Sequence, residues 1–331
     1  MNVAWDADLR SVTANDDQLA SALTHVVADG PASGTRVTLV QCYRGFHSRI
    51  LLDRGMDIGT TWYRGTPLSW TSSRGERPAG STDDDQGWHL GWAGGLLTTC
   101  GLLNAGEPSE GHGQHGRYTD QPAERVSIDR RHGAAALSDD VIVRGEIREG
   151  DALGRGLLLR RTLRFSTVRP EIQVTDVTEN ESSQPAQAPI LYHLNFGYPF
   201  LRPDSATDAA IRRSTQIEGE PRAFPRSMGE PNDEPDEVFE HDVEADRDGW
   251  ASMTLTGGTV PWSVAVRWDT AELPRVFTWR RRQRGSYVQA IEPANCSVLG
   301  RLADRSAGRA PILEPGESRT TQLAISVSEG I

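Results

Sequence analysis

The sequence predicts an all-β fold, a large antiparallel β-sandwich with one short helix near the N-terminus. Two observations predict it. From Thr35 onward, short segments in which apolar and polar residues alternate are separated by clusters of Gly, Pro, Asn and Asp, as in strands joined by turns. Long amphipathic helices do not alternate with these segments, which argues against an α/β fold. No linker clearly divides the chain, so we expect one domain over residues 1–331.

The short helix is expected just after Asn15. Asn15 and Gln18 resemble a capping box, in which side chains satisfy the free backbone N–H groups of a first helical turn. Apolar residues follow at helical spacing, at Leu19, Ala22, Leu23 and Val26.

Alternation with a period of two marks the strands. It runs over residues 141–147 and again over residues 157–165. A turn signal at Arg169-Pro170 precedes Ile172 and Val174, so residues 157–174 predict an antiparallel hairpin in a sheet with one polar face. Later strands are expected over residues 251–255, 262–268, 276–279, 287–291 and 321–327.

Two segments interrupt this regularity. Residues 103–119 are rich in Gly and polar residues, and residues 219–240 carry many acids and prolines. Both predict long loops. Such loops on a rigid scaffold often carry binding residues, although the acidic loop is also compatible with a mobile, solvated excursion.

The composition excludes several classes of function. The net charge of −11 disfavours nucleic acid as a partner. The first residues carry acids where a signal peptide has basic residues, and no apolar segment is long enough to span a membrane. We therefore expect a cytoplasmic protein that does not bind membranes.

Two residue types narrow the chemistry further. The sequence contains no lysine, which removes Schiff-base chemistry and the phosphate-loop lysine. Cys42, Cys100 and Cys296 have no metal-like spacing and cannot all pair within the chain, which suits a reducing compartment. Alternatively they are small buried apolar residues.

Three segments carry candidate catalytic residues, and the first is residues 111–117. This segment reads Gly-His-Gly-Gln-His-Gly-Arg, so glycines lie on both sides of His112 and directly after His115. The glycines allow the backbone to approach a ligand closely. The alternative is a surface loop with incidental histidines.

The second segment, residues 191–199, is an apolar strand. Alternation places His193 and Asn195 on one face and Tyr192 and Leu194 on the other. An imidazole and an amide that project together suit ligand hydroxyls. A histidine satisfied within the core is the alternative.

The third segment, residues 287–295, is an apolar strand that reaches a carboxylate at Glu292. Pro293 follows and is expected to lead the chain out of the sheet. Glu292 is therefore placed like a catalytic base at a strand end, or is an exposed glutamate without a role.

The order of these motifs resembles the aldose 1-epimerase (galactose mutarotase) superfamily, in which a loop His-Gly motif, a strand His with a nearby aromatic residue and Asn, and a late Glu-Pro motif build the site. The sequence is more closely similar to a bacterial branch of it, a domain of unknown function. The likeness extends from about residue 15 to about residue 327, and its segments are residues 51–58, 94–102, 115–117, 192–199 and 291–295.

The resemblance implies a galactose mutarotase-like β-sandwich with a carbohydrate in an open cleft. It assigns Glu292 as the general base, His193 as the general acid and His115 as a donor to the ring oxygen of the sugar. The anomeric hydroxyl loses a proton while the ring oxygen gains one; the ring opens, the C1–C2 bond rotates, and the steps reverse. With ordinary pKa values of about 4.3 for Glu and about 6.5 for His, the base is ionised and the acid partly protonated near neutral pH. Neither a cofactor nor a metal is needed.

The sequence departs from the family pattern in two places. Residues 193–196 read His-Leu-Asn-Phe, which moves the aromatic residue. The aspartate that galactose enzymes place between the second His and the Glu has no clear counterpart, and Asp233, Asp236 and Asp242 are all open for it. The identity of the sugar is therefore not inherited.

Other polar residues are candidates for sugar contact. Arg54 and Asp57 either pair with neighbouring charges as structural supports or, in the case of Arg54, reach the sugar. Arg117 lies beside His115 and is open to the same two interpretations.

Trp279 and Arg280 offer a ring for stacking and a charged donor, although Trp279 is also compatible with simple cover for the sheet. Asn195 and Asn295 are the amide candidates for contact with sugar hydroxyls.

Several functions are compatible with these residues. We expect an epimerase or mutarotase acting on a carbohydrate; the alternatives are an isomerase or lyase acting next to a carbonyl, and a sugar-binding domain without catalysis. A metal-dependent variant would bring His112, His115, His193 and Glu292 onto one ion. The oligomeric state, a homodimer included, stays open.

Overall fold

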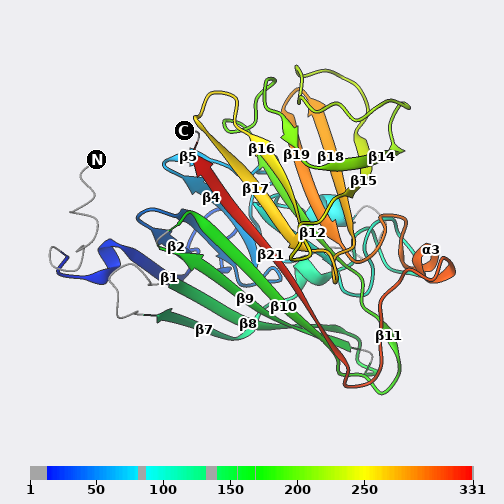
Figure 1. Cartoon of the computed structure of the whole chain (residues 1–331). Helices are drawn as coiled ribbons and strands as arrows, with labels where there is room; N and C mark the ends of the chain where they lie inside the picture. The colour runs from blue at the N-terminus through cyan, green and yellow to red at the C-terminus, as the bar shows by residue number, and fades with distance from the viewer. Residues whose placement is uncertain (1–12, 81–86, 132–139, 155, 168, 330–331) are drawn as a thin grey trace.

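The computed structural model describes residues 13–80, 87–131, 140–154, 156–167 and 169–329, which form the antiparallel β-sandwich that the sequence predicts (Figure 1). Residues 1–12, which begin the acidic N-terminal segment, lie outside the described residues. Two large sheets face each other across one apolar core. No helix in the described ranges has the length and apolar character that a membrane span requires.

The first sheet contains the strands that carry the candidate catalytic residues. In order across the sheet, its strands are β1 (Ala20–Val26), β2 (Arg36–Cys42), β3 (Phe46–Leu51), β4 (Asp57–Tyr63), β6 (Leu97–Gly101), β12 (Ile190–Gly197), β19 (Ser286–Ala294), β18 (Arg275–Gln283), β15 (Glu237–Val243) and β14 (Ile211–Glu218), with β5 (Thr66–Pro67) paired to β4.

The second sheet closes the other side of the core. Its strands are, in order, β13 (Thr207–Asp208), β16 (Trp250–Thr256), β17 (Trp262–Asp269), β21 (Ser318–Glu329), β10 (Glu171–Asn180), β9 (Gly156–Ser166), β8 (Asp140–Gly150) and β7 (Glu124–Arg131). Figure 1 shows β21, in red, between β17 and β10.

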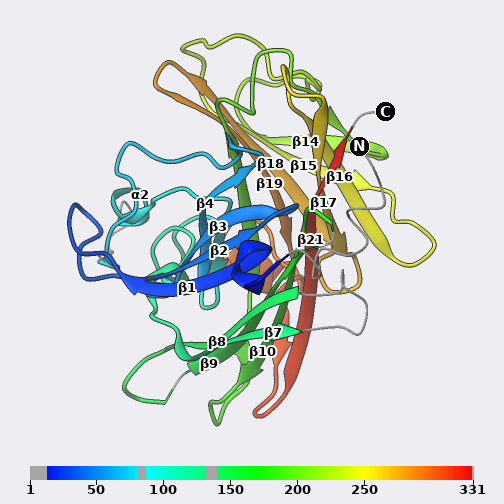
Figure 2. The same cartoon turned by 90° about the vertical axis from the view of Figure 1, so that its left-hand side faces the viewer.

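Short elements complete the described fold. They are a two-stranded sheet of β11 (Ala186–Gln187) and β20 (Ile312–Leu313), the 3-10 helices η2 (Asp16–Gln18) and η3 (Tyr118–Asp120), and the α-helices α2 (Gly87–Gly91) and α3 (Arg301–Ser306). Figure 2 shows α2 on the side of the molecule opposite β16, β17 and β21.

The predicted hairpin is confirmed. β9 and β10 pair antiparallel, with Ile172 opposite Phe165 and Val174 opposite Leu163. These four side chains are buried in the core, while the residues between them are less buried or exposed. The alternation in the sequence therefore identified the core face correctly. The later predicted strands are also confirmed, as β16, β17, β18, β19 and β21.

The predicted N-terminal helix is wrong beyond its first turn. The Asn15 side chain accepts the Asp17 N–H, as the capping pattern predicts, but the helix is the single 3-10 turn η2. Of the apolar residues at helical spacing, Leu19 ends this turn, and Ala22, Leu23 and Val26 lie in β1, which pairs with β2. Leu23 and Val26 stay largely exposed, so their spacing reflects no buried helical face, and the edge of β2 offers the segment backbone hydrogen bonds instead.

Both predicted loops are present with adjusted limits. The first ends where η3 begins at Tyr118. The second ends at Asp236, because residues from Glu237 onward form β15 and pair with β18. Although residues 237–240 include two glutamates, they form a strand in which Val238 and Phe239 are buried.

Arg161 on β9 is the centre of a buried polar network between the sheets. Its guanidinium is fully buried. It donates to both carboxylate oxygens of Asp176 on β10, at 3.0 and 2.7 Å, and to Asp57 on β4 at 2.9 Å. A further hydrogen bond of 2.8 Å reaches the Thr99 hydroxyl on β6. Because Asp57 and Thr99 belong to the first sheet, the network joins the two sheets.

Tyr192 on β12 extends this network. Its hydroxyl donates to Asp176 at 2.8 Å and is hydrogen-bonded to the Thr321 hydroxyl on β21 at 2.6 Å. Alternation along β12 then points the next side chain, His193, to the face turned away from the second sheet. The network therefore fixes which face of the first sheet carries His193.

We predict that Arg161→Met destabilises the protein by about 3–5 kcal/mol, because it leaves the carboxylates of Asp57 and Asp176 buried without their partner. The control is Arg160→Met on the same strand, whose exposed ion pairs with Glu179 and Glu146 are worth about 0–1 kcal/mol. Urea unfolding measures both. Equal losses for the two variants would contradict the role of the network.

Candidate active site

His193 projects from the middle of the first sheet. β12 is hydrogen-bonded to β6 on one side and to β19 on the other, and all its residues are buried. A strand paired on both sides holds its side chains in fixed positions. His193 is 4% exposed, so the imidazole is nearly cut off from water.

Glu292 lies opposite His193 on the neighbouring strand. The register pairs Leu191 with Ala294 and Leu194 with Ile291, which sets His193 against Glu292 on the same face. His193 Nε2 is 3.4 Å from Glu292 Oε1. Glu292 is 2% exposed. Two residues 99 positions apart in the sequence thus form one buried acid–base pair.

Four tryptophans, which the sequence analysis largely missed, build the walls around this pair. The His193 ring centroid lies 5.2 Å from Trp92, 5.6 Å from Trp279 and 6.1 Å from Trp88. Trp70 contacts Trp92 and Trp279 in turn. Only Trp279 was predicted; the others lie on α2 or outside the periodic segments, and their concentration over residues 70–92 was the available signal.

His115 approaches the pair from the loop of residues 103–119. Its ring centroid lies 4.5 Å from Trp88 and 6.0 Å from His193. Its Nδ1 accepts the Gly106 N–H at 3.3 Å, which in the neutral imidazole assigns the proton to Nε2. Nε2 is then a donor, the property required for contact with a sugar ring oxygen.

Close backbone packing fixes the position of His115. Gly116 has φ +72°, and a Cβ there would lie 2.4 Å from the carbonyl oxygen of Asn104 and 2.5 Å from that of Gly101. His115 itself has φ +58°, a left-handed conformation that is costly for a residue with a Cβ. The glycine on one side of His115 is thus needed for close approach, as the sequence suggested.

The electrostatics of the pair differ from the sequence-based expectation. Burial raises the pKa of Glu292 to about 8 and lowers the pKa of His193 to about 3. The pKa of His115 is also held well below its usual range, by burial and then by the neighbouring His193 and His89. Ordinary pKa values are therefore the wrong assumption. At neutral pH the pair holds one proton, and it resides on Glu292.

Several polar atoms of the site lack hydrogen-bond partners within the described part of the chain. They are His193 Nδ1, Glu292 Oε1, Asn195 Oδ1 and Trp88 Nε1. A buried polar atom without a partner costs about 1–3 kcal/mol. A group of them around one acid–base pair is explained by a polar ligand that supplies the missing bonds.

The two candidate asparagines have different surroundings. Asn195 donates to the Gly95 carbonyl oxygen at 3.2 Å and keeps its own side-chain oxygen without a partner. Asn295 accepts the Ile190 N–H at 2.8 Å and donates to the Ala188 carbonyl oxygen at 3.2 Å. The structure therefore leaves Asn195 a group for a ligand, whereas Asn295 fastens the chain that leads into β12.

Arg54 and Asp57 lie away from the pair. Asp57 belongs to the Arg161 network. Arg54 is buried, donates to the Pro78 carbonyl oxygen at 3.3 Å and lies 3.6 Å from Asp120. The structure thus supports the interpretation of both as structural residues.

Trp279 and Arg280 point to opposite faces of β18. The register pairs Phe277 with Glu292, so Trp279 shares their face. Arg280 donates on the other face to the Ser227 carbonyl oxygen and to Gln289. The expectation that both residues serve the site is therefore wrong for Arg280.

Arg117 has a structural contact at the base of the His115 loop. Its backbone N–H donates to Glu149 at 3.3 Å, and Glu149 also accepts the Leu102 N–H. Burial raises the pKa of Glu149 to about 7. One buried carboxyl group thus closes the loop between residues 102 and 117, a role that the sequence did not reveal.

Of the three aspartates left open by the sequence, Asp236 lies nearest to the tryptophans. Its carboxylate accepts the Trp279 Nε1–H at 3.1 Å and pairs with Arg281 at 2.9 Å. Asp233 and Asp242 are exposed. Asp236 is therefore the aspartate best placed to contact a ligand beside Trp279.

The metal-dependent alternative gains no support. His112 Nε2 lies 3.1 Å from Arg301 Nη1, and the residue lines a separate cavity. In the ranges that the structure describes, no three His, Cys, Asp or Glu side chains form a group that could hold a metal ion. The three cysteines are free and buried.

Comparisons with known proteins give the family and the fold of this chain. A family model described as a domain of unknown function, DUF4432, matches residues 32–327. No curated protein matches the sequence significantly.

Solved structures share the fold. A candidate aldose 1-epimerase from Klebsiella pneumoniae subsp. pneumoniae has a TM-score of 0.85 at 22% identity, over 96% of this chain and 87% of that chain. A galactose mutarotase-like protein from Clostridium acetobutylicum has a TM-score of 0.63 at 13% identity, over 94% and 99%. A candidate aldose 1-epimerase from Escherichia coli K12 has a TM-score of 0.56 at 14% identity, over 94% and 99%. These likenesses confirm the predicted galactose mutarotase-like fold.

The raised pKa of Glu292 predicts how Glu292→Gln changes stability with pH. Between the ordinary pKa of 4.5 and about 8, the folded state holds a proton that the unfolded state has lost, so the stability of the natural protein falls as pH rises. We expect Glu292→Gln to gain stability relative to the natural protein by up to about 1.4 kcal/mol per pH unit between pH 5 and 8.

Chemical unfolding at several pH values measures this difference, and the exposed variant Glu220→Gln is the control. His193 also contributes to stability, and its contribution increases with pH over the acidic range. Because both proteins contain His193, this contribution cancels to a first approximation in the difference between them. A stability difference that stays constant with pH would contradict the assignment.

Proposed function

The chain belongs to the DUF4432 family, and from this premise we propose that it is an aldose 1-epimerase-type enzyme that interconverts the anomers of a sugar by general acid–base catalysis. One observation carries the proposal. His193 and Glu292 face each other at 3.4 Å inside tryptophan walls, surrounded by polar atoms that lack partners in the described structure. Aromatic faces and unpaired polar atoms together suit a sugar, which has apolar C–H faces and hydroxyl edges.

The reaction begins with the proton that the pair already holds. Transfer of this proton from Glu292 to His193 gives an ionised base and a protonated acid without exchange with solvent. Glu292 then accepts the proton of the anomeric hydroxyl while His193 gives its proton to the ring oxygen, and the ring opens. After rotation about C1–C2 the proton movements reverse, so the pair regains its starting state.

The surrounding residues position the sugar in this proposal. His115 Nε2–H donates to the ring oxygen, which stabilises the charge that develops there. Asn195 Oδ1 accepts a bond from a sugar hydroxyl, and Asp236 is the acceptor beside Trp279. The proposed class of substrate is a free sugar or sugar derivative, since the anomeric hydroxyl must be unsubstituted.

One feature favours a second candidate, a sugar-binding protein without turnover. The buried pair rests in its neutral form, which is the less reactive one. Binding of sugars with no turnover across a broad panel would support this candidate. Deuterium incorporation at carbon from heavy water would instead indicate an isomerase or lyase, because mutarotation exchanges only hydroxyl protons.

Two expectations from the sequence stay predictions, a cytoplasmic location, which three free buried cysteines suit, and a single domain. The oligomeric state, a homodimer included, stays open.

We predict that Glu292→Gln lowers the rate of anomer interconversion by about 10²-fold or more, because the amide cannot accept the proton. Polarimetry with a panel of freshly dissolved sugars measures the rate above the spontaneous reaction. Glu220→Gln, exposed on a loop, should retain the activity. An unchanged rate in Glu292→Gln, with its fold intact, would remove the proposal.

The pH profile tests the shared proton. In the active form, His193 and Glu292 together hold one proton. The free pair loses this proton from Glu292 with a pKa of about 8, and it gains a second proton, on His193, only near pH 3. We therefore expect kcat/KM to be level around neutral pH and to fall above about pH 8. A profile that rises through pH 8 would show that the deprotonated pair is the active form.

A further inference from the structure

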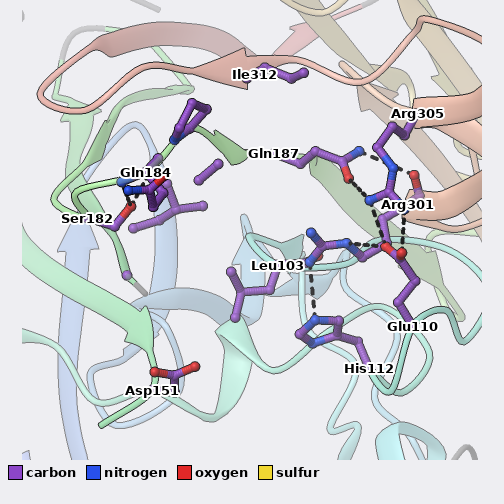
Figure 3. A pocket seen from close by; sticks show the side chains of 14 residues that line it. Leu103, Glu110, His112, Asp151, Ser182, Gln184, Gln187, Arg301, Arg305 and Ile312 are labelled. Carbon is purple, nitrogen blue, oxygen red and sulfur yellow. Dashed lines mark hydrogen bonds and ion pairs between the residues drawn. The ribbon is translucent and has the colours of Figure 1, made fainter. Parts of the chain in front are cut away.

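A second cavity, of about 450 Å³, lies beside the loop of residues 103–119 (Figure 3). Its volume is within the range of about 300–1,000 Å³ of small-molecule sites. Its lining includes neither His193 and Glu292 nor the tryptophans around them. The loop serves both places, because His112 lines the cavity while His115 contacts Trp88.

Two arginines from α3 form one end of this cavity. Arg301 Nε lies 3.1 Å from Glu110 Oε2, and Arg305 Nη1 donates to the same oxygen at 3.0 Å. Arg305 also donates to Gln187 at 3.1 Å. Figure 3 shows the two guanidinium groups converging on the Glu110 carboxylate, which marks where an anion is held.

This end of the cavity has an excess of positive charge. Arg301 and Arg305 supply two positive charges, and Glu110 supplies one negative charge. His112 adds none in the form that accepts a hydrogen bond from Arg301 through Nε2, at 3.1 Å. Asp151 lies at the opposite end of the cavity (Figure 3). A net positive charge is therefore left for an anion from solution, since the buried Glu149 near Arg301, whose pKa burial raises to about 7, offsets it only in part.

An incoming anion can reach this charge. The Arg305 side chain is 44% exposed. Glu110 adopts φ +53°, an unfavourable left-handed conformation for a residue with a Cβ, so its pairing with the arginines opposes a backbone cost. A carboxylate or phosphate that binds the same guanidinium groups therefore competes with Glu110, whose backbone conformation is unfavourable.

The rest of the lining suits a hydroxylated ring. Gln184 presents an amide group, and Leu103 and Ile312 present apolar surface (Figure 3). The amide of Gln187 is engaged by Arg305 and by the Arg301 carbonyl oxygen. We propose that this cavity is a second binding site, which takes a small anionic sugar, acidic or phosphorylated, with its anionic group on Arg301 and Arg305.

Calorimetric titration of the full chain with D-glucuronate, D-glucose 6-phosphate and neutral D-glucose tests the site. Arg305→Met should weaken the binding of the anionic sugars at least tenfold, because it removes one of the two guanidinium groups. Glu110→Gln should strengthen it several-fold, because it removes the internal competitor. Comparison of glucuronate with glucose 6-phosphate distinguishes a carboxylate from a phosphate ligand.

Arg309→Met is the matched control, since Arg309 pairs with Asp304 near α3 and does not line the cavity. It should leave the anion affinities unchanged, and D-glucose should respond to none of the three variants. Thermal unfolding confirms that each variant is folded. Failure of both anions to bind the natural protein, equal effects of Arg305→Met and Arg309→Met, or weaker binding to Glu110→Gln would overturn the proposal. The readout is binding, so it does not depend on whether His193 and Glu292 are catalytic.

Discussion

The buried contact between Arg161 and the two carboxylates of Asp57 and Asp176 is the constraint on which the candidate site depends. The pattern of side chains along a strand has a period of two, so a slip of one residue would exchange the two faces of β12. Tyr192, bound to Asp176, would then replace His193 on the ligand side. Compared with apolar residues of the same volume, a complete polar network inside an apolar core adds little to stability, but its geometry accepts one register only. The sequence thus uses buried charge to define which residue faces the ligand.

The same burial determines the chemistry of the pair. Removal of water disfavours both charged forms, which is why the proton resides on Glu292 while His193 is neutral. The neutral pair and the ion pair contain the same number of protons, so a polar ligand can convert one into the other by moving a single proton. In this account, sugar binding itself supplies the polar surroundings that an ionised base and a protonated acid require.

Much of the fold was predictable from the sequence because strands with one buried face leave a simple alternation. The failure at Leu19–Val26 has a physical reason: an exposed edge strand contains apolar residues that no core requires, and their spacing is then uninformative. His115, His193 and Glu292 were predicted as a set from motif order, and strand register brings the latter two together. Trp88 on α2, and Trp70 and Trp92 outside the helices and strands, were missed because neither a short helix nor a loop carries a periodic signal.

The roles of the surrounding charges were less predictable, because a charged residue in a strand-like segment looks the same whether it binds a ligand or another residue. Arg54, Asp57 and Arg280 proved to be engaged within the protein, and Glu149 drew no notice although it closes the His115 loop. Only the contacts of a charged side chain in the folded structure show whether it binds another residue or is left for a ligand. The order of motifs in the sequence identified the candidate reacting residues more readily than the residues that support them.

The proton shared by His193 and Glu292 is tested most directly by infrared difference spectroscopy of the Glu292 carboxyl group near neutral pH, assigned by comparison with Glu292→Gln. We predict a protonated carboxyl band in the free protein that disappears when a sugar binds, as the proton moves to His193. An ionised Glu292 in the free protein, or a carboxyl band that a bound sugar leaves unchanged, would contradict this prediction.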